Sequence, residues 1–256
     1  MTETNVIIDN DIIQSFEPIS LADMGKVKLM NRIDSKYVTT VGKIRELLKA
    51  ISSDYYIQEI SGRCNMPYYT RYYDTPEMDM YYQHQRGKKS RQKIRMRRYE
   101  GSDTPPFIEI KSKNNKGRTR KKRVEMKDDT DLLSYQSFIS ANSNYDPENL
   151  VAQIENHFYR ITLVDKAMTE RITIDTNLEF HNLTTDAKVN LYEIGIIEWK
   201  RDGNLCKSGL DNYLKDLRIH PGGFSKYCIG MAVTNPDMKQ NRIKKRIRKV
   251  KSLIEK

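Results

Sequence analysis

The chain has 256 residues, of which 38% are hydrophobic and 31% are charged, a composition typical of a globular protein. Its mean hydropathy of −0.75, and the lack of any apolar run of about 20 residues, argue against a membrane-spanning protein. The acidic start of the chain lacks the pattern of a signal peptide. Cys64, Cys206 and Cys228 are far apart and odd in number, which favours free thiols in a reducing cytoplasm.

The positive charge is concentrated in two segments. Residues 86–123 hold sixteen Lys and Arg residues against three acidic ones, and residues 239–256 hold nine against one. Together these segments carry more positive charge than the net +11 of the whole chain, so the remainder is acidic. Such dense charge indicates a polyanionic partner, for which nucleic acid, an anionic membrane and a phosphate chain are the candidates.

The order of elements is helix, then many short strands, then helix. Apolar spacing predicts helices over Val41–Ile51 (with Thr40 as N-cap), Leu132–Ile139, Pro147–Phe158 and Leu210–Leu217. Segments between them alternate with period two, as strands do. In the tail, Ile243, Ile247, Val250 and Ile254 form an apolar stripe beside a basic face. This predicts a helix that either packs on the body or binds an anionic membrane peripherally.

One segment places cations on a single strand face. In Arg91-Gln-Lys93-Ile-Arg95-Met-Arg97 four cations occupy alternate positions, so all four side chains project from one face of a strand. Neighbours on that face lie roughly 7 Å apart, and at an effective dielectric of about 20 they repel by about 2 kcal/mol. In open water long side chains spread apart and escape most of this cost. In an enclosed interior they require a bound anion.

Five further segments repeat charged residues at period two, mostly with apolar residues on the reverse face. They are Arg32–Lys36, Phe107–Lys113, Lys121–Glu125, Arg171–Asp175 and Ile196–Lys200. One interpretation is an open antiparallel sheet with one wet face and one packed face. The other is a curled sheet whose charged faces line a cationic tunnel, with helices outside. We favour the tunnel, because four adjacent cations with no interleaved acid are a poor design for a solvated face.

A tunnel of this kind suits phosphoryl transfer. Mg²⁺ or Mn²⁺ is usually held by one or two carboxylates together with phosphate oxygens of the substrate. Arg binds phosphate as a bidentate fork and Lys as a point charge. Positioning and charge neutralisation supply most of the rate. The alternative is a nucleic-acid-binding protein, because tyrosines such as those in Tyr68–Tyr73 accompany the cationic strands and are able to stack on bases.

Eight motifs occur in order along the chain: Arg32-Ile-Asp34-Ser-Lys36-Tyr37, Tyr73-Asp74-Thr75, Tyr82-Gln-His84, Arg91-x-Lys93-x-Arg95-x-Arg97-x-Tyr99, Glu109-x-Lys111, Arg171-Ile-Thr-Ile-Asp175, Glu198-x-Lys200 and Phe224-Ser225-Lys226-Tyr227. This series resembles the VTC domain, the polyphosphate polymerase domain of the vacuolar transporter chaperone complex, which belongs to the triphosphate tunnel metalloenzymes. The resemblance implies an α+β fold, an antiparallel β-barrel tunnel of about eight strands with a charged lumen and helices packed outside. It also implies an N-terminal segment (1–30), a tunnel domain (31–235) and a basic amphipathic C-terminal helix (236–256).

The resemblance further implies roles for single residues. The residues implied to hold triphosphate or polyphosphate are Lys36, Arg91, Lys93, Arg95, Arg97, Lys111, Arg123, Arg171, Lys200 and Lys226. The implied catalytic residues are Lys36, Arg95, Glu198 and Lys200. Glu198 is implied to be the main ligand of Mn²⁺ or Mg²⁺, with Glu109 in support. The expected activity moves the γ-phosphate of ATP to a polyphosphate chain. A triphosphatase of the same fold and a non-catalytic polyanion-binding protein are the alternatives.

Overall fold

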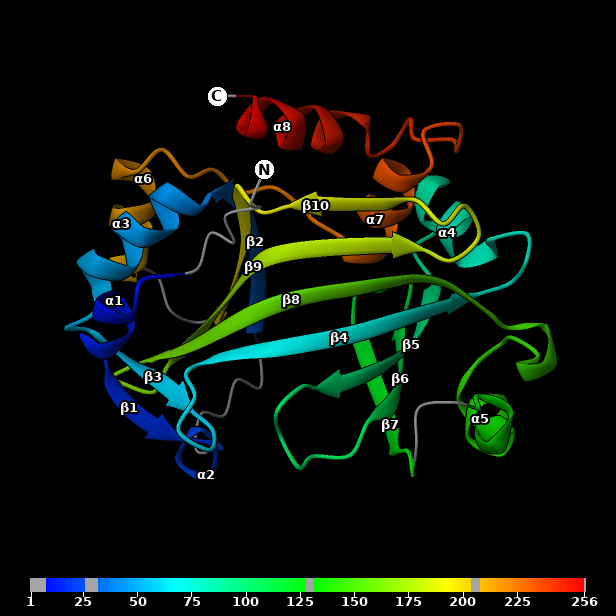
Figure 1. Cartoon of the computed structure of the whole chain (residues 1–256), viewed down its shortest axis with the longest axis horizontal. Helices are drawn as coiled ribbons and strands as arrows, with labels where there is room; N and C mark the ends of the chain where they lie inside the picture. Colours follow the sequence, from blue (N-terminus) through cyan, green and yellow to red (C-terminus); the bar gives the residue numbers. More distant parts are fainter. Residues whose placement is uncertain (1–7, 26–31, 128–130, 204–207, 256) are drawn as a thin grey trace.

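The main element of the fold is a large antiparallel sheet with helices around it (Figure 1). The structure is a computed structural model that describes residues 8–25, 32–127, 131–203 and 208–255. The strands are β1 (Glu17–Ser20), β2 (Arg32–Thr40), β3 (Tyr55–Glu59), β4 (Asn65–Asp74), β5 (Arg91–Tyr99), β6 (Phe107–Lys113), β7 (Thr119–Glu125), β8 (Val151–Asp165), β9 (Glu170–Asn182), β10 (Lys188–Leu191) and β11 (Ile194–Asp202).

Eight of the strands pair in the spatial order β2-β11-β9-β8-β4-β5-β6-β7, and every pair along this path is antiparallel. Three shorter strands lie off the path: β10 beside β9, β3 beside β8, and β1 parallel to β3. The predicted tunnel architecture of about eight antiparallel strands is confirmed. One detail differs, because among the described residues no strand pairing joins β7 to β2.

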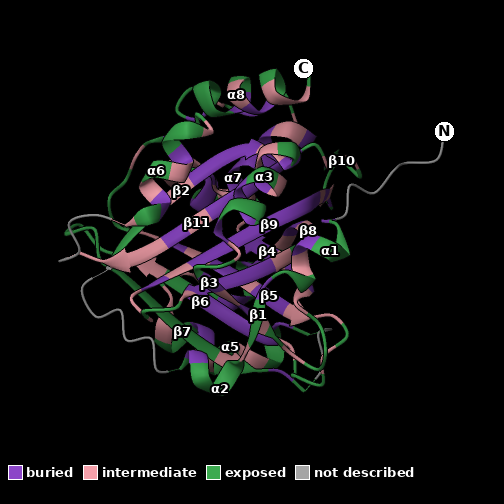
Figure 2. Cartoon of the chain, turned by 90° about the vertical axis from the view of Figure 1, so that its left-hand side faces the viewer, coloured by how far each residue is buried: buried purple, intermediate pink, exposed green. Residues whose placement is uncertain are grey.

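All six segments with charged residues at period two are strands, as predicted. In β5 the apolar members Ile94 and Met96 are fully buried on one face, while the cations occupy the other. The apolar face of β5 and β6 packs against α5 (Gln136–Asn142), whose Ile139 is also fully buried. Figure 2 shows that buried residues follow the central strands, whereas β7 is largely exposed.

Helices cover the outside of the sheet, as the tunnel interpretation requires. α1 (Asn10–Gln14), α3 (Val41–Ile51) and α6 (Gly209–Asp216) pack on β8, β9 and β11 through a shared apolar cluster. α3 matches its predicted bounds, and the Thr40 side chain caps it by accepting from the Lys43 amide. α6 and the helical segment 133–142, which begins with a 3₁₀ turn over Leu133–Tyr135, are also confirmed. The short helix α2 (Leu21–Met24) follows β1.

The predicted helix over Pro147–Phe158 is wrong. Only Pro147–Asn149 form a 3₁₀ turn, and β8 begins at Val151. Ile154 and Phe158 are separated by one helical turn in sequence, but they also lie on one face of a strand with Asn156 between them. Asn156 is fully buried and donates to the Glu179 backbone at 2.7 Å. This buried polar residue hides the strand period, and pairing with β4 and β9 decides the conformation.

Three helices lie at the other end of the sheet: α4 (Asp79–Gln85), α7 (Lys226–Thr234) and α8 (Lys244–Ile254). α7 is buried on nearly every side, so it has no apolar stripe that could predict it. The tail forms a helix as predicted, and Ile243, Ile247 and Val250 belong to the apolar core. None of the described helices has the length and apolar character needed to cross a membrane.

Candidate functional site

One face of the curled sheet holds the charged residues, because strand register aligns them. Glu198 on β11 lies opposite Lys36 on β2 and Thr173 on β9. Arg95 on β5 lies opposite Glu109 on β6. Two consecutive residues of a strand face opposite ways, so these pairings bring the alternate charged residues of neighbouring strands onto a common surface. We call this surface the charged face.

Glu198 is the first of three carboxylates that are each bonded to two cations. Its carboxylate accepts from Lys36 Nζ at 2.5 Å and lies 3.1 Å from Lys200 Nζ. Burial alone raises the pKa of Glu198, but Lys36 and Lys200 outweigh this effect and hold the pKa well below its ordinary value. The carboxylate is therefore ionised at neutral pH and neutralises only one of its two lysines.

Asp175 is the second carboxylate. Arg160 on β8 binds it in a bidentate manner at 2.5 and 2.8 Å, and Lys226 Nζ is hydrogen-bonded to the same group. Lys226 is the first residue of α7, whose N-cap is Ser225, so the helix start fixes this ammonium beside the sheet. Burial lowers the pKa of Lys226 to about 7, Asp175 opposes the shift, and Arg160 adds to it.

Glu109 is the third carboxylate and is 2% exposed. It accepts from Arg95 and lies 3.4 Å from Lys121 Nζ. Arg95 also donates to the Tyr72 hydroxyl at 3.4 Å. Burial acts to raise the pKa of Glu109, but Arg95 and Lys121 outweigh it and lower the pKa to about 2. All three carboxylates thus have the same arrangement, and each leaves one positive charge uncompensated when both of its cations are protonated.

Arg97 adds a buried cation without a carboxylate partner in the described part of the chain. It is 7% exposed, donates to the Thr70 hydroxyl at 3.2 Å, and lies over the Tyr68 ring. Burial, followed by repulsion from Arg95 and Arg160, lowers its pKa to about 10. The low pKa thus results from burial together with two neighbouring cations.

The other predicted phosphate ligands lie on or beside the same face. Lys93 donates to the Ser225 hydroxyl at 2.6 Å, so it joins β5 to the start of α7. Lys111 is within electrostatic range of Lys36 and Glu198, across the tunnel from its own strand. Arg171 shares a register position with Lys200. Two of the predicted phosphate ligands, Arg91 and Arg123, lie further from the centre of the charged face.

The two outlying residues are Arg91 and Arg123. Arg91 donates to the Lys88 carbonyl at 2.8 Å, at the start of β5. Arg123 lies opposite Glu109 in the register but is exposed on β7, where its guanidinium covers the Phe107 ring. The structure therefore brings together Lys36, Lys93, Arg95, Arg97, Lys111, Arg171, Lys200 and Lys226, and leaves Arg91 and Arg123 at the margins.

A loop before α7 completes the enclosure where strand pairing does not. Gly222 donates its amide to the Lys36 carbonyl at 2.7 Å, and Pro221 forms an isolated bridge with Tyr37. Three residues later Ser225 accepts from Lys93 on β5. The loop thus runs from the β2 edge to β5, and the charged face lies inside the curl.

Arg95 Nε and the Thr173 hydroxyl are buried donors on the charged face that have no hydrogen-bond acceptor among the described residues. Thr173 lies directly opposite Glu198. A buried donor without a partner costs about 1–3 kcal/mol, so such groups mark places where a ligand supplies the missing acceptor. An oxyanion provides acceptors of the right kind.

The charged face offers few oxygen ligands for a metal ion. The described residues contain no group of three or more His, Cys, Asp or Glu side chains able to hold an ion. Glu198 and Glu109 lie on different strands, each bonded to its own two cations. Glu198 therefore fits a hard divalent cation that takes most of its ligands from phosphate oxygens and water, and does not fit an all-protein cage.

The tyrosines that suggested base stacking are packing residues. Tyr72 stacks on Tyr227 with ring centroids 5.3 Å apart, and Tyr68 stacks on Phe158 at 5.1 Å. Tyr69 is 5% exposed and bonded to Glu155. These rings have partners within the protein, and their arrangement gives no support to a nucleic-acid interface.

Sequence reasoning missed Arg160 and Thr173. Arg160, Thr162 and Val164 alternate with Ile161 and Leu163, which is a strand signal. A register shift between His157 and Tyr159 interrupts the strand, so this alternation does not continue from the first half of β8 into the second. The signal for Arg160 was therefore present but confined to the second half of the strand.

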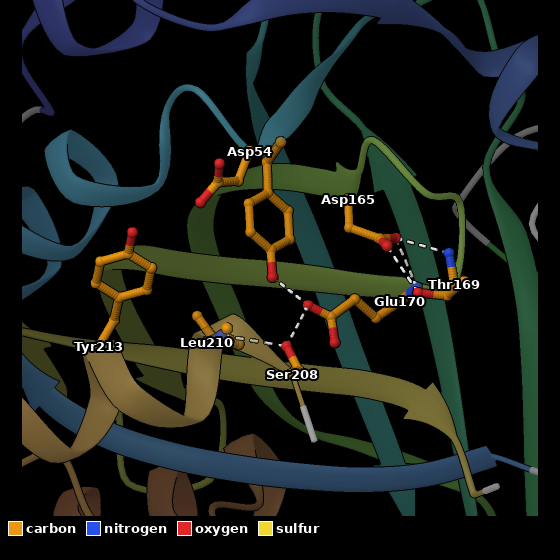
Figure 3. A pocket seen from close by; sticks show the side chains of 9 residues that line it. Asp54, Asp165, Thr169, Glu170, Ser208, Leu210 and Tyr213 are labelled. Atoms are coloured by element: carbon orange, nitrogen blue, oxygen red, sulfur yellow. Dashed lines mark hydrogen bonds between the residues drawn. The ribbon is translucent and has the colours of Figure 1, made fainter. Parts of the chain in front are cut away.

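A cavity outside the tunnel, of about 350 Å³, is explained without a ligand (Figure 3). Glu170, 3% exposed, lies at its wall and accepts from Tyr55, from Ser208 Oγ at 2.8 Å and from Trp199 Nε1 at 2.9 Å. Ser208 is the N-cap of α6. Glu170 thus anchors α6 to the sheet, and its carboxylate is already fully bonded.

Two of the three cysteines lie in the described part of the chain. Cys64 and Cys228 are free thiols, and Cys228 is buried in α7. Cys206 lies outside the described residues.

Comparison with solved structures finds distant likenesses. A candidate adenylate cyclase from Vibrio parahaemolyticus is 14% identical, with a TM-score of 0.42, and the match covers 77% of this chain and 96% of that one. A candidate adenylyl cyclase from Hippeastrum, described as having a dominant triphosphatase activity, is 13% identical with a TM-score of 0.48, covering 79% and 96%. A candidate adenylate cyclase from Bacillus halodurans is 12% identical with a TM-score of 0.45, covering 77% and 96%.

No curated protein matches the chain. The family model described as the VTC domain matches residues 31–235. This confirms the resemblance that the eight motifs indicated, and the match spans the strands and α7 that carry the charged face. The chain belongs to the VTC-domain family.

Proposed function

We propose that this protein transfers the γ-phosphate of ATP to a polyphosphate chain inside its cationic tunnel. One observation supports this most strongly: three carboxylates, two of them buried and Glu198 half-buried, are each bonded to two cations, and further cations surround them. Such an enclosed excess of positive charge is neutralised by a multiply negative guest. We assign the activity to residues 31–235 and place the protein in the cytoplasm, where free thiols are stable.

The proposed roles follow from position. Lys36, Arg95 and Lys200 hold the reacting phosphates, because they surround Glu198 and Glu109 and have flexible or forked donors. Lys93, Arg97, Lys111, Arg171 and Lys226 hold the rest of the chain or nucleotide phosphates, with Arg91 and Arg123 at the margins. Thr173 is an additional donor near the reacting group.

We propose Glu198 as the main ligand for Mn²⁺ or Mg²⁺, with Glu109 in support. Such an ion, when bound, neutralises negative charge on phosphate oxygens. Glu198 would have to release Lys36 or Lys200 to hold the ion, and the released ammonium would then be available to a phosphate oxygen.

The reaction exchanges one phosphorus–oxygen bond for another. A terminal oxygen of the polyphosphate forms a bond to the γ-phosphorus while the bond from that phosphorus to the β–γ bridging oxygen breaks, and ADP leaves with that electron pair. Neither bond change requires a covalent enzyme intermediate. The side chains of the charged face align the two anions and reduce their mutual repulsion.

Incubation with ATP, polyphosphate primer and Mn²⁺, followed by separation of long chains from orthophosphate, tests the proposal. Growth of long chains with release of ADP supports it. Orthophosphate alone assigns the protein to the triphosphatase alternative, in which water attacks instead. Tight binding with no turnover assigns it to the polyanion-binding alternative.

Contact of residues 239–256 with an anionic membrane remains a prediction. The apolar stripe of α8 lies in the protein core, so only the basic side chains are available for that contact. Binding to vesicles that contain anionic lipid, and its loss at high salt, would measure it.

Arg95→Ala is expected to weaken triphosphate binding by about 1.5–3 kcal/mol, the usual value of a hydrogen bond to a charged group. Arg98→Ala is the matched control, because Arg98 lies on the reverse face of the same strand, over the Tyr69 ring. Calorimetric titration with inorganic triphosphate compares the two. Equal affinities for both variants would place Arg95 outside the binding site.

Triphosphate binding is expected to include proton uptake by Lys226 above about pH 7. Burial lowers the Lys226 pKa to about 7 in the free protein, and a bound phosphate raises it again. Lys226 is then neutral before binding and charged after it, so its contribution to affinity decreases as the pH rises, by up to about tenfold per unit. Titrations in buffers of different ionisation enthalpy measure the uptake. Lys226→Arg keeps its charge and should lack this component. Identical uptake in both proteins would assign the proton to another group.

A further inference from the structure

The C-terminal helix α8 is packed on the body of the protein. Ile243 is 1% exposed, Ile247 7% and Val250 2%, and all three belong to the core that includes α4 and α7 residues. Figure 1 shows α8 lying along the edge of the molecule, beyond β10 and α7. Because the apolar stripe is packed against the core, the helix cannot rotate, and its basic side chains project from its other faces.

Two arginines of this region lie against glycines that flank tunnel elements. A Cβ added at Gly223 would be 3.1 Å from Nη2 of Arg246, and one added at Gly87 would collide with the Arg242 guanidinium. The Lys249 ammonium lies 3.4 Å from the His220 carbonyl in the same loop as Gly223. The glycines therefore leave space that the two guanidinium groups occupy.

These contacts place the arginines beside two segments that lead into the charged face. Gly223 precedes Ser225, which accepts from Lys93, and Lys226, which is bonded to Asp175. Gly87 lies in the turn that leads into β5. The loops that touch Arg246 and Arg242 thus continue directly into the charged face.

Cations of the tunnel strand β5 and cations of the α8 region both lie close enough to His84 to lower the pKa of its imidazole. Its pKa is lowered to about 3, first by burial and then by Lys93, Arg91, Arg246 and Arg242. Two of these cations belong to the tunnel strand β5, and two belong to the α8 region. The charges of the tunnel and of the tail are therefore continuous around His84.

Arg242 and Arg246 are exposed, and neither pairs with a carboxylate among the described residues. A row of cations with no interleaved acid favours an anion. The guanidinium group is well suited to bidentate contact with phosphate. A polyphosphate chain longer than the triphosphate inside the tunnel must extend out of the tunnel, where its negative charges are exposed.

We propose that Arg242 and Arg246 form an additional phosphate-binding subsite at the tunnel opening, which holds the part of a polyphosphate chain that extends beyond the catalytic triphosphate. The proposal rests on the proposed function. It assigns to the C-terminal helix a role in selecting long chains over short ones.

The double variant Arg242→Gln/Arg246→Gln tests the subsite. Its matched control is Lys245→Gln/Arg248→Gln, which removes the same charge from exposed positions of α8. Calorimetric titrations with inorganic triphosphate and with long-chain polyphosphate are compared for both proteins at one ionic strength. We expect the first variant to lose at least about tenfold in affinity for the long chain and less than about twofold for triphosphate. The control should lose less than about twofold for either.

A restoring substitution gives a second measurement. Gly223→Lys in the Arg246→Gln background places a new ammonium where the guanidinium was, and should recover most of the long-chain affinity. Equal losses in the double variant and its control would overturn the subsite. So would an equal loss for triphosphate and the long chain. If the unmodified protein binds neither ligand, the proposed function itself fails, and this outcome is distinct from the others.

Discussion

Glu198→Gln is expected to reduce turnover by at least about 100-fold while leaving triphosphate binding intact. The ionised carboxylate is the group proposed to carry the metal ion, and charge stabilisation of the transferring phosphate by such an ion amounts to several kcal/mol. Binding is retained because the neutral amide no longer neutralises either Lys36 or Lys200. The two lysines then have their full charge available to the ligand.

Rates of ATP consumption and calorimetric titrations with triphosphate measure the two effects separately. Glu77→Gln is the control, because Glu77 is exposed in the turn between β4 and α4. Unimpaired turnover in Glu198→Gln would remove Glu198 from the metal site. A loss of binding that parallels the loss of turnover would instead show that the carboxylate mainly positions its lysines.

Arg160→Met is expected to lower the free energy of unfolding by about 3 kcal/mol, the lower end of the range for breaking a buried ion pair. The substitution leaves Asp175, whose side chain is 4% exposed, without its bidentate partner. Lys226 still compensates part of the charge, and this places the expected loss at the lower end. Denaturant unfolding monitored by Trp199 fluorescence measures it.

The double variant Arg160→Met/Asp175→Leu separates the two contributions. At a pH well above 7, where Lys226 is neutral, replacing both partners by apolar groups of similar size leaves no unpaired buried charge, so most of the lost stability should return. A single variant as stable as the unmodified protein would show that the pair contributes little to the fold.

The alternation of charged and apolar residues determined which side chains share a face. In β5 the period-two pattern alone placed Lys93 and Arg95 together and Ile94 and Met96 on the reverse, and the structure has this arrangement. The periods of α3 and of the C-terminal helix were determined in the same way. These features depend on residues within a few positions of one another, so a single sequence contains them.

The pairings across strands were decided only by the tertiary structure. Lys36 and Glu198 are 162 residues apart, and their contact depends on the register of β2 against β11. Arg160 meets Asp175 only after the register shift in β8. Local periodicity contains no information about such partners. The closing loop at Gly222 and the position of α8 on the body of the protein were likewise set by packing, because an apolar stripe indicates that a helix is covered but not by which surface.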